Sequence, residues 1–459
     1  MDYEFGKKLY ELRERSGLTQ KKAAAKLGVT DKAVSKWETG TAKPGVEMIR
    51  KISALYNISV EKLLEILEEK KHPKIVKIVL TGGPCSGKTT AMSWIENAMT
   101  ERGYKVIFVP EAATELINAG LNKQSFESVV DFQKNIMSLQ IEKEKIYEEA
   151  AKRLNTEKVL IVCDRGTMDS KAYLSSIDFN ILLDDLKLDE VELRDRYSGV
   201  FHLETSAKLG DEYYTLENNK ARSETVEEAR RLDDKIIESW VGHPHLRVIK
   251  NNKDFNEKMK DLIKEITSML GEPAPYEIER KFLIDMPNLK RLEENPYCKK
   301  VEIIQTYLKS SNGHEIRVRQ RGEKGSYIYY ITEKVPVTNM KRIEKERLIT
   351  EKEYLELLMR ADTHSHQIRK NRYFLMQDGI CYEIDIYPFW KDRAIMEVEL
   401  TNEKDEIKMP SFIKLIREVT DEDEYKNRNL AKMENPGELE IEKEKTKVLM
   451  KHWNNSSNF

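Results

Sequence analysis

The sequence is poor in cysteine, has no long apolar run and no strong net charge. Its four cysteines, Cys85, Cys163, Cys298 and Cys381, lie far apart, without the close spacing of a metal site. A disulfide framework or a structural zinc site is therefore not expected, and reduced thiols favour an intracellular protein. No stretch approaches the ~20 apolar residues of a membrane span, and the charged N-terminus is unlike a signal peptide. We expect a cytoplasmic protein without a transmembrane segment.

The charge balance excludes a general attraction to nucleic acid or to membrane surfaces. Lys and Arg number 78 against 80 Asp and Glu, which gives a formal net charge of -2. Partners must therefore be sought in local patches of charge. The 459 residues are too many for one ordinary hydrophobic core, so the length predicts two or three domains.

Changes of pattern divide the chain at two linkers, EEKKHPK and GEPAPY. Residues 1–67 have helical periodicity, 74–270 alternate short β-branched runs with long helices, and 275–435 are rich in strands with alternating charge. Residues 436–459 form a highly charged tail. The predicted fold class is multidomain: an all-α helix-turn-helix, then an α/β parallel sheet, then an α+β antiparallel β-barrel.

The first domain has the features of a helix-turn-helix, with a tight turn at Gly28 and a second helix that opens at Thr30, a good N-cap. It resembles the XRE or lambda-repressor family in Leu18-Thr19-Gln20, Ala24, Leu27-Gly28-Val29, Val34-Ser35-Lys36-Trp37-Glu38 and Pro44. The resemblance implies that Lys32, Ser35 and Lys36 face DNA and that Gln20 lies near a phosphate. Basic residues outnumber acidic ones here, which suits DNA phosphates. A small helical bundle used for protein contacts remains the alternative.

The second domain opens with a phosphate-binding loop between a β-branched strand and an amphipathic helix. The expected nucleotide-binding residues are Gly82, Gly83, Pro84, Cys85, Ser86, Gly87, Lys88, Thr89 and Thr90. Glycines let backbone N–H groups wrap a phosphate, Lys88 neutralises the outer phosphates and Thr89 can hold Mg²⁺. Asp164 ends a later strand and suits a second metal contact, although a turn or helix cap is its alternative role. Glu111 follows another strand at the ligand-binding edge of such sheets.

Residues 75 to 268 resemble the AAA-type domain of NadR-like nicotinamide riboside kinases and of the TRPL translocation defect family. The resemblance rests on Gly82 to Thr89, Pro110-Glu111-Ala112-Ala113-Thr114, Phe132-Gln133, Cys163-Asp164-Arg165-Gly166, Asn219 with Arg222, and Trp240-Val241-Gly242-His243-Pro244. It implies an ATP or GTP ligand, with Glu111 orienting or deprotonating an acceptor hydroxyl. By the same likeness Arg165 contacts substrate, Arg222 belongs to a closing lid and Asn251 approaches the base. The family includes both kinases and nucleotide-binding regulators.

The third domain repeats charged residues at every second position of its strands. These sets are Glu277/Glu279/Lys281, Arg317/Arg319, Arg342/Glu344/Glu346, Lys370/Arg372, Glu383/Asp385 and Glu397/Glu399. Because side chains alternate with period two, each set shares one face of its strand. One strand alone would favour a solvent-facing sheet surface, but the recurrence favours a barrel with a charged interior.

This domain resembles the CYTH superfamily, the triphosphate tunnel fold, over residues 276 to 432. Glu277-Ile278-Glu279-Arg280-Lys281 meets its EXEXK signature, and Gln305 to Leu308, Thr332-Glu333-Lys334 and Glu418-Val419-Thr420 extend the likeness. The resemblance implies Mg²⁺- or Mn²⁺-dependent hydrolysis of inorganic or organic triphosphates, or cyclic AMP formation. The implied metal ligands are Glu277, Glu279, Glu397 and Glu399. The implied phosphate ligands are Lys281, Arg317, Arg319, Lys334, Arg342, Lys370 and Arg372, with Lys281 and Asp385 as catalytic candidates.

Together these domains predict a DNA-binding regulator that responds to nucleotide or polyphosphate. The alternative is a bifunctional nucleoside or riboside kinase and inorganic triphosphatase in which the helix-turn-helix only localises or dimerises the chain. Binding of acidic lipid headgroups is a third, weaker hypothesis, suggested only by some relatives of the middle domain. The oligomeric state stays open, with a homodimer among the options.

Overall fold

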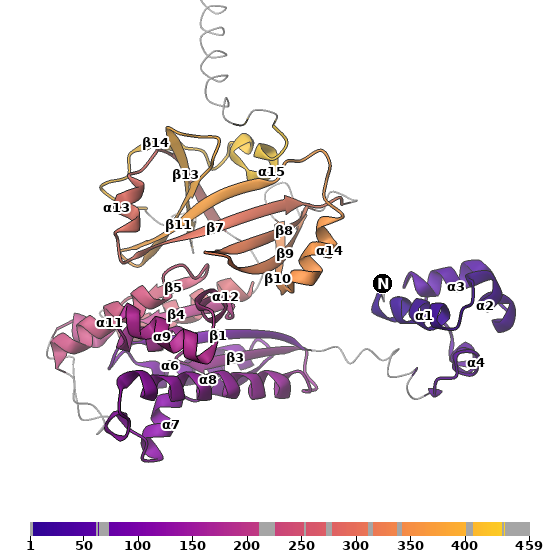
Figure 1. Ribbon diagram of the computed structural model, residues 1–459, viewed down its shortest axis with the longest axis horizontal. Helices are drawn as coiled ribbons and strands as arrows, with labels where there is room; N and C mark the ends of the chain where they lie inside the picture. The colour runs from indigo at the N-terminus through magenta and orange to yellow at the C-terminus, as the bar shows by residue number, and fades with distance from the viewer. Residues whose placement is uncertain are drawn as a thin grey trace, which may run out of the picture. The chain divides into compact units, whose positions relative to one another are not determined.

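The computed structural model describes residues 3–60, 63, 73–210, 225–251, 254–271, 278–310, 315–336, 342–400, 407–433 and 436 (Figure 1). The chain divides into two compact units. The first is Met1–Lys74 with Ala150–Glu157, and the second is Ile75–Glu149 with Lys158–Phe459. Across the described residues, no helix combines the length and apolar character needed to cross a membrane.

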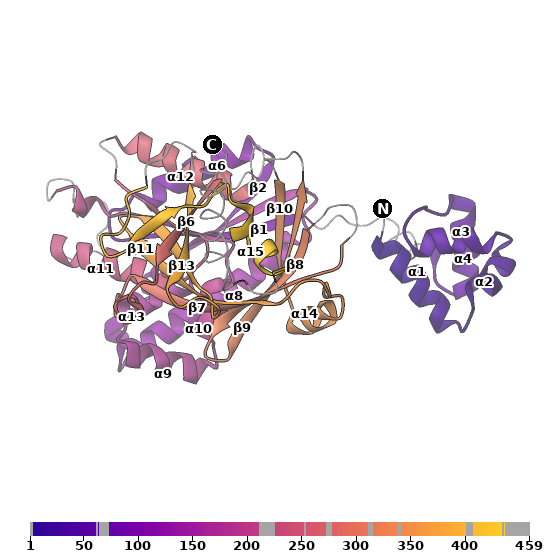
Figure 2. The ribbon, with the colours of Figure 1, turned by 90° about the horizontal axis from the view of Figure 1, so that it is seen from above.

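The first unit contains a cluster of four helices, seen together in Figure 2. They are α1 (Tyr3–Arg15), α2 (Gln20–Leu27), α3 (Asp31–Glu38) and α4 (Val46–Tyr56). The side chains of Thr19 and Thr30 cap α2 and α3 by accepting backbone N–H groups, and Gly28 ends α2 with a left-handed φ of 73°. Leu9, Trp37 and their apolar neighbours pack between the helices. The predicted helix-turn-helix fold is therefore confirmed.

The first part of the second unit is a five-stranded sheet in the order β2-β3-β1-β4-β5. The strands are β1 (Lys74–Gly82), β2 (Tyr104–Val109), β3 (Lys158–Asp164), β4 (Gly199–Leu203) and β5 (Leu246–Ile249). The helices are α6 (Lys88–Thr100), α7 (Ala112–Asn118), α8 (Val129–Ala151), α9 (Ser176–Leu186), α10 (Glu190–Asp195), α11 (Val226–Trp240) and α12 (Phe255–Leu270). The pairs β2–β3, β1–β4 and β4–β5 are parallel, as the sequence predicted.

Helices pack on both faces of this sheet because its strands are apolar on both sides. Residues of α6 and α12, such as Ile95 and Leu262, share a core cluster with Ile78 and Leu80 of β1. On the other face, Lys77 of β1 pairs with Glu144 of α8 at 2.9 Å. The chain order reverses at β1, which lies between β3 and β4. Ligands of open parallel sheets bind at such a reversal, beyond the carboxyl ends of the strands.

The second part of this unit is a nine-stranded sheet in the order β10-β9-β8-β7-β11-β12-β13-β6-β14. The strands are β6 (Ile278–Asp285), β7 (Cys298–Tyr307), β8 (Glu315–Glu323), β9 (Ser326–Pro336), β10 (Arg342–Ile349), β11 (Ile368–Gln377), β12 (Ile380–Ile386), β13 (Arg393–Leu400) and β14 (Leu415–Glu418). The helices are α13 (Leu289–Glu293), α14 (Glu351–Leu358) and α15 (Asn427–Leu430). All recorded pairings between these strands are antiparallel.

The register of this sheet places the charged positions on one face. Glu397 lies opposite both Lys281 and Glu383, while Arg372 lies opposite Asp385. Gln305, further along the same face, lies opposite Arg319. On the reverse side, the apolar residues Phe282, Ile284, Leu375, Ile384 and Val398 form a core cluster. The predicted alternation of charged and apolar faces is confirmed.

The sheet is open, whereas the sequence predicted a closed barrel. Its edge strands are β10 and β14, and the pairings recorded for the described residues do not join these two edges. Strand β14 has four residues and its pairing with β6 shifts between Leu415 and Arg417. A short, irregular edge strand ends strand pairing, which accounts for the open edge.

Candidate functional sites

The second helix of the helix-turn-helix, α3, exposes two of the predicted DNA-binding residues. Lys32 and Lys36 are exposed and Ser35 is half-buried. The Gln20 amide donates to Glu38 Oε2 at 2.8 Å, so in this state it braces α2 against α3. The exposed lysines leave positive charge on the helix that enters the major groove in DNA-binding proteins of this fold.

A buried arginine fixes the orientation of α3. Arg13 of α1 donates from Nε to Glu38 Oε1 at 2.6 Å and from Nη1 to the Leu18 carbonyl at 2.7 Å. The hydrogen bond with Glu38 raises the pKa of Arg13, so its charge persists. Because Glu38 also accepts from Gln20, one carboxylate joins three helices.

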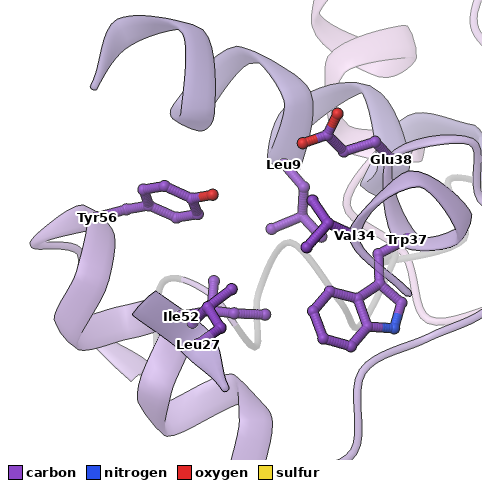
Figure 3. Close-up of a pocket in the computed structure, with 7 residues that line it drawn as sticks. All are labelled: Leu9, Leu27, Val34, Trp37, Glu38, Ile52 and Tyr56. Carbon is purple, nitrogen blue, oxygen red and sulfur yellow. The ribbon is translucent and has the colours of Figure 1, made fainter. Parts of the chain in front are cut away.

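A small cavity lies inside this helical cluster (Figure 3). Its volume is about 10 Å³, and its lining is Leu9, Leu27, Val34, Trp37, Glu38, Ile52 and Tyr56. A cavity of this size holds about one water molecule. It is a gap in the core, so the candidate function of this domain lies on its exterior.

The phosphate-binding loop spans the turn from β1 to α6. Cys85 has a φ of 57°, and Gly87 has a φ of 92° at the N-cap of α6. A Cβ atom on Gly82 would lie 2.2 Å from the Leu203 carbonyl oxygen, so only glycine fits there. The loop therefore brings backbone N–H groups together at a helix N-terminus, where phosphate binds readily.

Asp233 of α11 holds the start of this loop. Its Oδ1 accepts from Gly83 N at 2.9 Å and from Thr205 N at 3.1 Å, and it contacts His202 Nε2 at 3.0 Å. Burial alone would raise its pKa, but His202 and Lys208 bring it far below its usual range. Asp233 is therefore a buried anion that anchors the loop backbone.

Lys258 of α12 holds the other end of the loop. Its Nζ donates to Ser86 O at 3.0 Å, to Glu204 O at 2.6 Å and to Asn251 Oδ1 at 2.8 Å. Burial lowers the pKa of Lys258 to about 8. Asn251 also donates from Nδ2 to Thr205 O at 2.7 Å, so in this structure its side chain supports the loop.

Lys88, Glu111 and Arg165 meet at the carboxyl ends of β1, β2 and β3. Arg165 Nε donates to Glu111 Oε1 at 2.7 Å, and Thr114 Oγ1 donates to Glu111 Oε2 at 2.6 Å. Burial alone would raise the pKa of Glu111, but Arg165 and Lys88 lower it overall. Burial lowers the pKa of Lys88 to about 8, with a further lowering by Arg165. Lys88, Glu111 and Arg165, which were each singled out from the sequence, therefore lie close together in the structure.

Asp164 and Thr89 have the chemistry expected of magnesium ligands. Asp164 Oδ1 is buried without a hydrogen-bond partner among the described residues, and burial raises the pKa of this carboxyl. Thr89 and Thr90 are exposed on the first turn of α6. The Asp164 carboxylate oxygen would suit a divalent cation that also contacts a bound phosphate. Arg222, the predicted lid residue, lies outside the described residues.

Arg165 has a strained backbone that a further residue, Asp169, supports. Its φ is 66°, and its N–H donates to the Leu80 carbonyl at 3.0 Å. Asp169 Oδ2 accepts from Gly166 N at 2.7 Å, and its Oδ1 accepts from Thr81 Oγ1 at 2.5 Å. Left-handed backbone at a non-glycine residue persists only where its surroundings fix it, and such residues gather at functional sites.

The sequence prediction missed Asp169, Asp233 and Lys258, although two of them leave a detectable signal. Asp233 follows Ala229 by four residues and precedes Ile237 and Trp240 on the buried face of α11. Lys258 shares the buried face of α12 with Leu262. A charged residue on an otherwise apolar helix face needs a buried partner, which marks both positions.

Cations and carboxylates on the charged face of the antiparallel sheet neutralise one another. Lys281 Nζ lies 2.6 Å from Glu397 Oε1, and Arg372 Nη2 lies 2.5 Å from Glu397 Oε2. Arg372 Nε donates to Asp385 Oδ1 at 2.7 Å, and Lys370 also pairs with Asp385. Burial lowers the pKa of Lys370 to about 8 despite that contact. Of these residues, Lys281, Lys370 and Arg372 are the predicted phosphate ligands, Glu397 is a predicted metal ligand and Asp385 is a catalytic candidate.

The other predicted phosphate and metal ligands either lie along the same face of the sheet or fall outside the described residues. Arg317 is buried, and Arg319 Nη1 lies 3.6 Å from Glu346 Oε2. Lys334 and Arg342 belong to β9 and β10, but their side chains are not described. Glu277 lies outside the described residues.

Two of the predicted metal ligands lie directly opposite each other. Glu279 of β6 is paired in register with Glu399 of β13. Among the described residues, no three His, Cys, Asp or Glu side chains are grouped to hold a metal ion. Mg²⁺ commonly uses one or two carboxylates together with substrate phosphates, so this pair fits the donor chemistry of such an ion.

The fold and these loops define a multidomain protein that joins a helix-turn-helix to a P-loop α/β domain and an antiparallel sheet. Residues 9–63 match the family model described as Helix-turn-helix, and residues 77–258 match the model described as AAA domain. Both regions agree with the resemblances found in the sequence.

The curated relatives match the first domain. The HTH-type transcriptional activator BcrR of Enterococcus faecalis is 39% identical over 13% of this chain and 30% of its own length. The HTH-type transcriptional regulator ImmR of Bacillus subtilis (strain 168) is 41% identical over 13% of this chain and 46% of its own length. The chain thus spans less than half the length of either relative.

Two solved structures show a limited similarity to this chain. The inorganic triphosphatase NE1496 is 26% identical, with coverage of 34% of this chain and 95% of that chain and a TM-score of 0.25. Thymidylate kinase from Ehrlichia chaffeensis is 17% identical, with coverage of 42% of this chain and 100% of that chain and a TM-score of 0.30.

Proposed function

We propose that this chain is a DNA-binding regulator that binds ATP or GTP at its P-loop and a second triphosphate on its charged sheet face. The observation that supports this most is the P-loop itself. Gly83 and Ser86 are tied down by Asp233 and Lys258 at the reversal point of the parallel sheet. A loop fixed in this way is organised for phosphate before any ligand arrives.

At the P-loop, the backbone N–H groups wrap the phosphates and Lys88 neutralises their outer charge. Thr89 and Asp164 would hold Mg²⁺, which would offset the remaining negative charge on the phosphates. Asn251, Arg165 and Arg222 are the proposed contacts to the rest of the ligand. Both ATP and GTP suit this arrangement.

On the sheet face, Lys281, Arg317, Arg319, Lys370 and Arg372 would bind the phosphates of a triphosphate, together with Lys334 and Arg342. Glu279, Glu399, Glu397 and Glu277 would hold Mg²⁺ or Mn²⁺, which neutralises the phosphates and favours attack by water. Lys281 lies beside Glu397 and would stabilise charge on the departing phosphate. This assignment rests on the CYTH resemblance and on the shared charged face.

A second candidate function is that of a bifunctional kinase and triphosphatase. The contact between Arg165 and Glu111 supports it, because a carboxylate beside Lys88 can accept a proton from an acceptor hydroxyl. In that case the helix-turn-helix would serve localisation or dimerisation, and a nucleoside or riboside would receive the phosphate.

DNA binding by the full chain tests the proposal. Selection from a random duplex library, followed by titration of the selected duplex at several salt concentrations, should give sequence-selective binding that weakens with salt. Absence of retention, or equal retention of every duplex, would contradict the regulator.

Phosphate release from ATP, GTP and tripolyphosphate, with and without the selected duplex, separates the two candidates. A regulator should show slow turnover that changes when DNA is bound. Fast transfer of phosphate to nucleosides or ribosides, independent of DNA, would favour the bifunctional enzyme.

A further inference from the structure

An arginine from the parallel sheet contacts the acidic end of the charged sheet face. Arg247 lies on β5, and its Nη2 is 2.5 Å from Glu399 Oε2 on β13. Its Nε is 3.4 Å from Glu265 Oε2 of α12. The two contacts place the Arg247 guanidinium between the nucleotide-binding part and the antiparallel sheet of the second unit.

Glu399 needs a cation because another carboxylate lies opposite it. The register pairs Glu399 with Glu279 and, two residues along, Glu397 with Lys281. Like charges directly opposite each other destabilise an antiparallel pair. Lys281 lies 3.4 Å from Glu279 and Arg247 contacts Glu399, so each glutamate of the pair has a cation beside it.

Arg247 is a permanent charge in this position. An arginine guanidinium keeps its proton over the whole pH range in which the protein can be studied. Its side chain is 21% exposed and that of Glu399 is 40% exposed, so solvent screens the pair only in part. A divalent cation that binds Glu399 must therefore compete with a guanidinium that does not lose its proton.

Two further ion pairs, Arg321–Asp195 and Lys299–Glu190, also join the antiparallel sheet to α10. Arg321 of β8 is buried and lies 2.7 Å from Asp195 Oδ2 of α10, while Lys299 of β7 lies 2.9 Å from Glu323 and 3.7 Å from Glu190 of α10. Burial would raise the pKa of Asp195, but Arg194 and Arg321 lower it to about 2. Removal of one partner from such a buried pair is strongly unfavourable, so the Arg321–Asp195 pair keeps β8 and α10 together.

We propose that Arg247 is a positioning residue for the charged sheet face: it holds Glu399 and lowers the affinity of the Glu279–Glu399 end for divalent cations. The nucleotide-binding part thereby sets the metal affinity of the neighbouring site. This inference rests on the proposed metal-dependent binding of triphosphate.

Titration of the full chain with Mn²⁺, followed by electron paramagnetic resonance, tests this role without a turnover assay. Arg247→Gln keeps hydrogen-bonding groups but removes the charge, and it should tighten Mn²⁺ binding by about fivefold to tenfold, a typical coupling for contacting groups. Glu399→Gln should weaken binding, and adding Arg247→Gln to it should then change little. Arg247→Met serves as a second neutral variant, and Arg247→Lys should stay close to the wild type.

Lys299→Met is the matched control, because it removes an ion pair between the same two parts without touching Glu399. It should leave Mn²⁺ affinity unchanged. Unchanged or weaker binding in both neutral Arg247 variants, in a wild type that does bind Mn²⁺, would overturn the inference. A wild type that neither binds Mn²⁺ nor cleaves tripolyphosphate would instead overturn the proposed function of the sheet face.

Discussion

Lys88 is a cation whose charge depends on pH in the range where the protein can be studied. Burial, with Arg165, lowers its pKa to about 8, so the ligand-free side chain loses its proton as pH rises through that value. Bound phosphate favours the charged form, so nucleotide binding should be strongest below pH 8 and weaken above it. Lys88→Arg should remove this dependence, because an arginine stays charged.

Lys88→Ala should weaken binding by about tenfold to a hundredfold, since a hydrogen bond to a charged group contributes ~1.5–3 kcal/mol. Titration with a fluorescent ATP or GTP analogue between pH 6.5 and 9.5 measures both effects. Lys105→Ala, at an exposed position of β2, is the control and should bind as the wild type does. If Lys88→Ala binds the nucleotide as tightly as the wild type does, the phosphates do not bind beside Lys88.

Glu279 and Lys281 should separate metal binding from phosphate binding on the charged face. Glu279→Gln removes one charge at constant volume, so tripolyphosphate hydrolysis should fall by about a hundredfold or more and be partly restored by higher Mn²⁺. Lys281→Ala should raise KM and also lower kcat, without rescue by Mn²⁺, because the lysine would bind substrate phosphate and stabilise charge on the departing phosphate. Steady-state phosphate release with full-length variants of wild-type melting temperature decides between them. If both variants hydrolyse tripolyphosphate at the wild-type rate, the charged face is not a catalytic site and is only a solvent-facing surface of the sheet.

Helix α11 is tied to the P-loop by one of two adjacent aspartates, which offers a matched pair of variants. Asp233 contacts the loop backbone, whereas Asp234 is partly exposed and pairs only with Lys208 in the recorded contacts of the described residues. Asp233→Asn should weaken nucleotide binding by about tenfold and destabilise the protein by ~3–5 kcal/mol, because it breaks a buried ionic network. Asp234→Asn should have little effect on either.

The pH dependence of this contribution follows from the same contacts. The folded pKa of Asp233 lies below its unfolded value, so its stabilisation is present at neutral pH and is lost as pH falls through the acid range. Chemical denaturation at pH 7 and at about pH 2.5, well below the ordinary aspartate pKa of ~3.9, measures it. An Asp233→Asn variant with the same deficit at both pH values would contradict an ionised Asp233 as the cause.

Helix α3 should carry the electrostatic part of DNA binding. Lys36 is exposed on α3, whereas Lys51 is exposed on α4 and pairs with Glu47 at 3.4 Å. Lys36→Ala should lower DNA affinity and, if it removes a phosphate contact, reduce the slope of log affinity against log salt by about 1. Lys51→Ala is the matched loss of charge and should change neither. Fluorescence anisotropy of a labelled duplex measures both, and equal effects would remove α3 from the interface.

Features that depend on neighbouring residues could be predicted from the sequence, whereas contacts between residues far apart in the chain could not. The Thr30 cap and the loop from Gly82 to Thr89 are encoded by neighbouring residues, and strand alternation gave the charged face from period two alone. The anchors of the loop were not predictable in this way, because Asp233 lies 150 residues from Gly83 and Lys258 lies 172 from Ser86. That the sheet stays open was also not predictable, because barrel closure depends on whether its two edge strands, β10 and β14, pair with each other.

The parallel sheet with its P-loop and the charged antiparallel sheet belong to one compact unit, so the two proposed ligand sites lie in the same part of the chain. Arg321 joins Asp195 and also donates to the Gly242 carbonyl, so β8 contacts the loop that follows α11. That helix carries Asp233, which contacts the P-loop. The segment from Asp233 to Gly242 thus contacts the P-loop at one end and β8 at the other.

In the proposed regulator, nucleotide binding and DNA binding are coupled in one chain. The most direct test is the affinity of the full chain for its selected duplex, measured by anisotropy with and without saturating ATP or GTP and Mg²⁺. We expect nucleotide to change DNA affinity by at least about fivefold, the usual lower range of coupling between sites, and to leave it unchanged in Lys88→Ala. Identical DNA affinity in the wild type, with nucleotide shown to be bound, would contradict it.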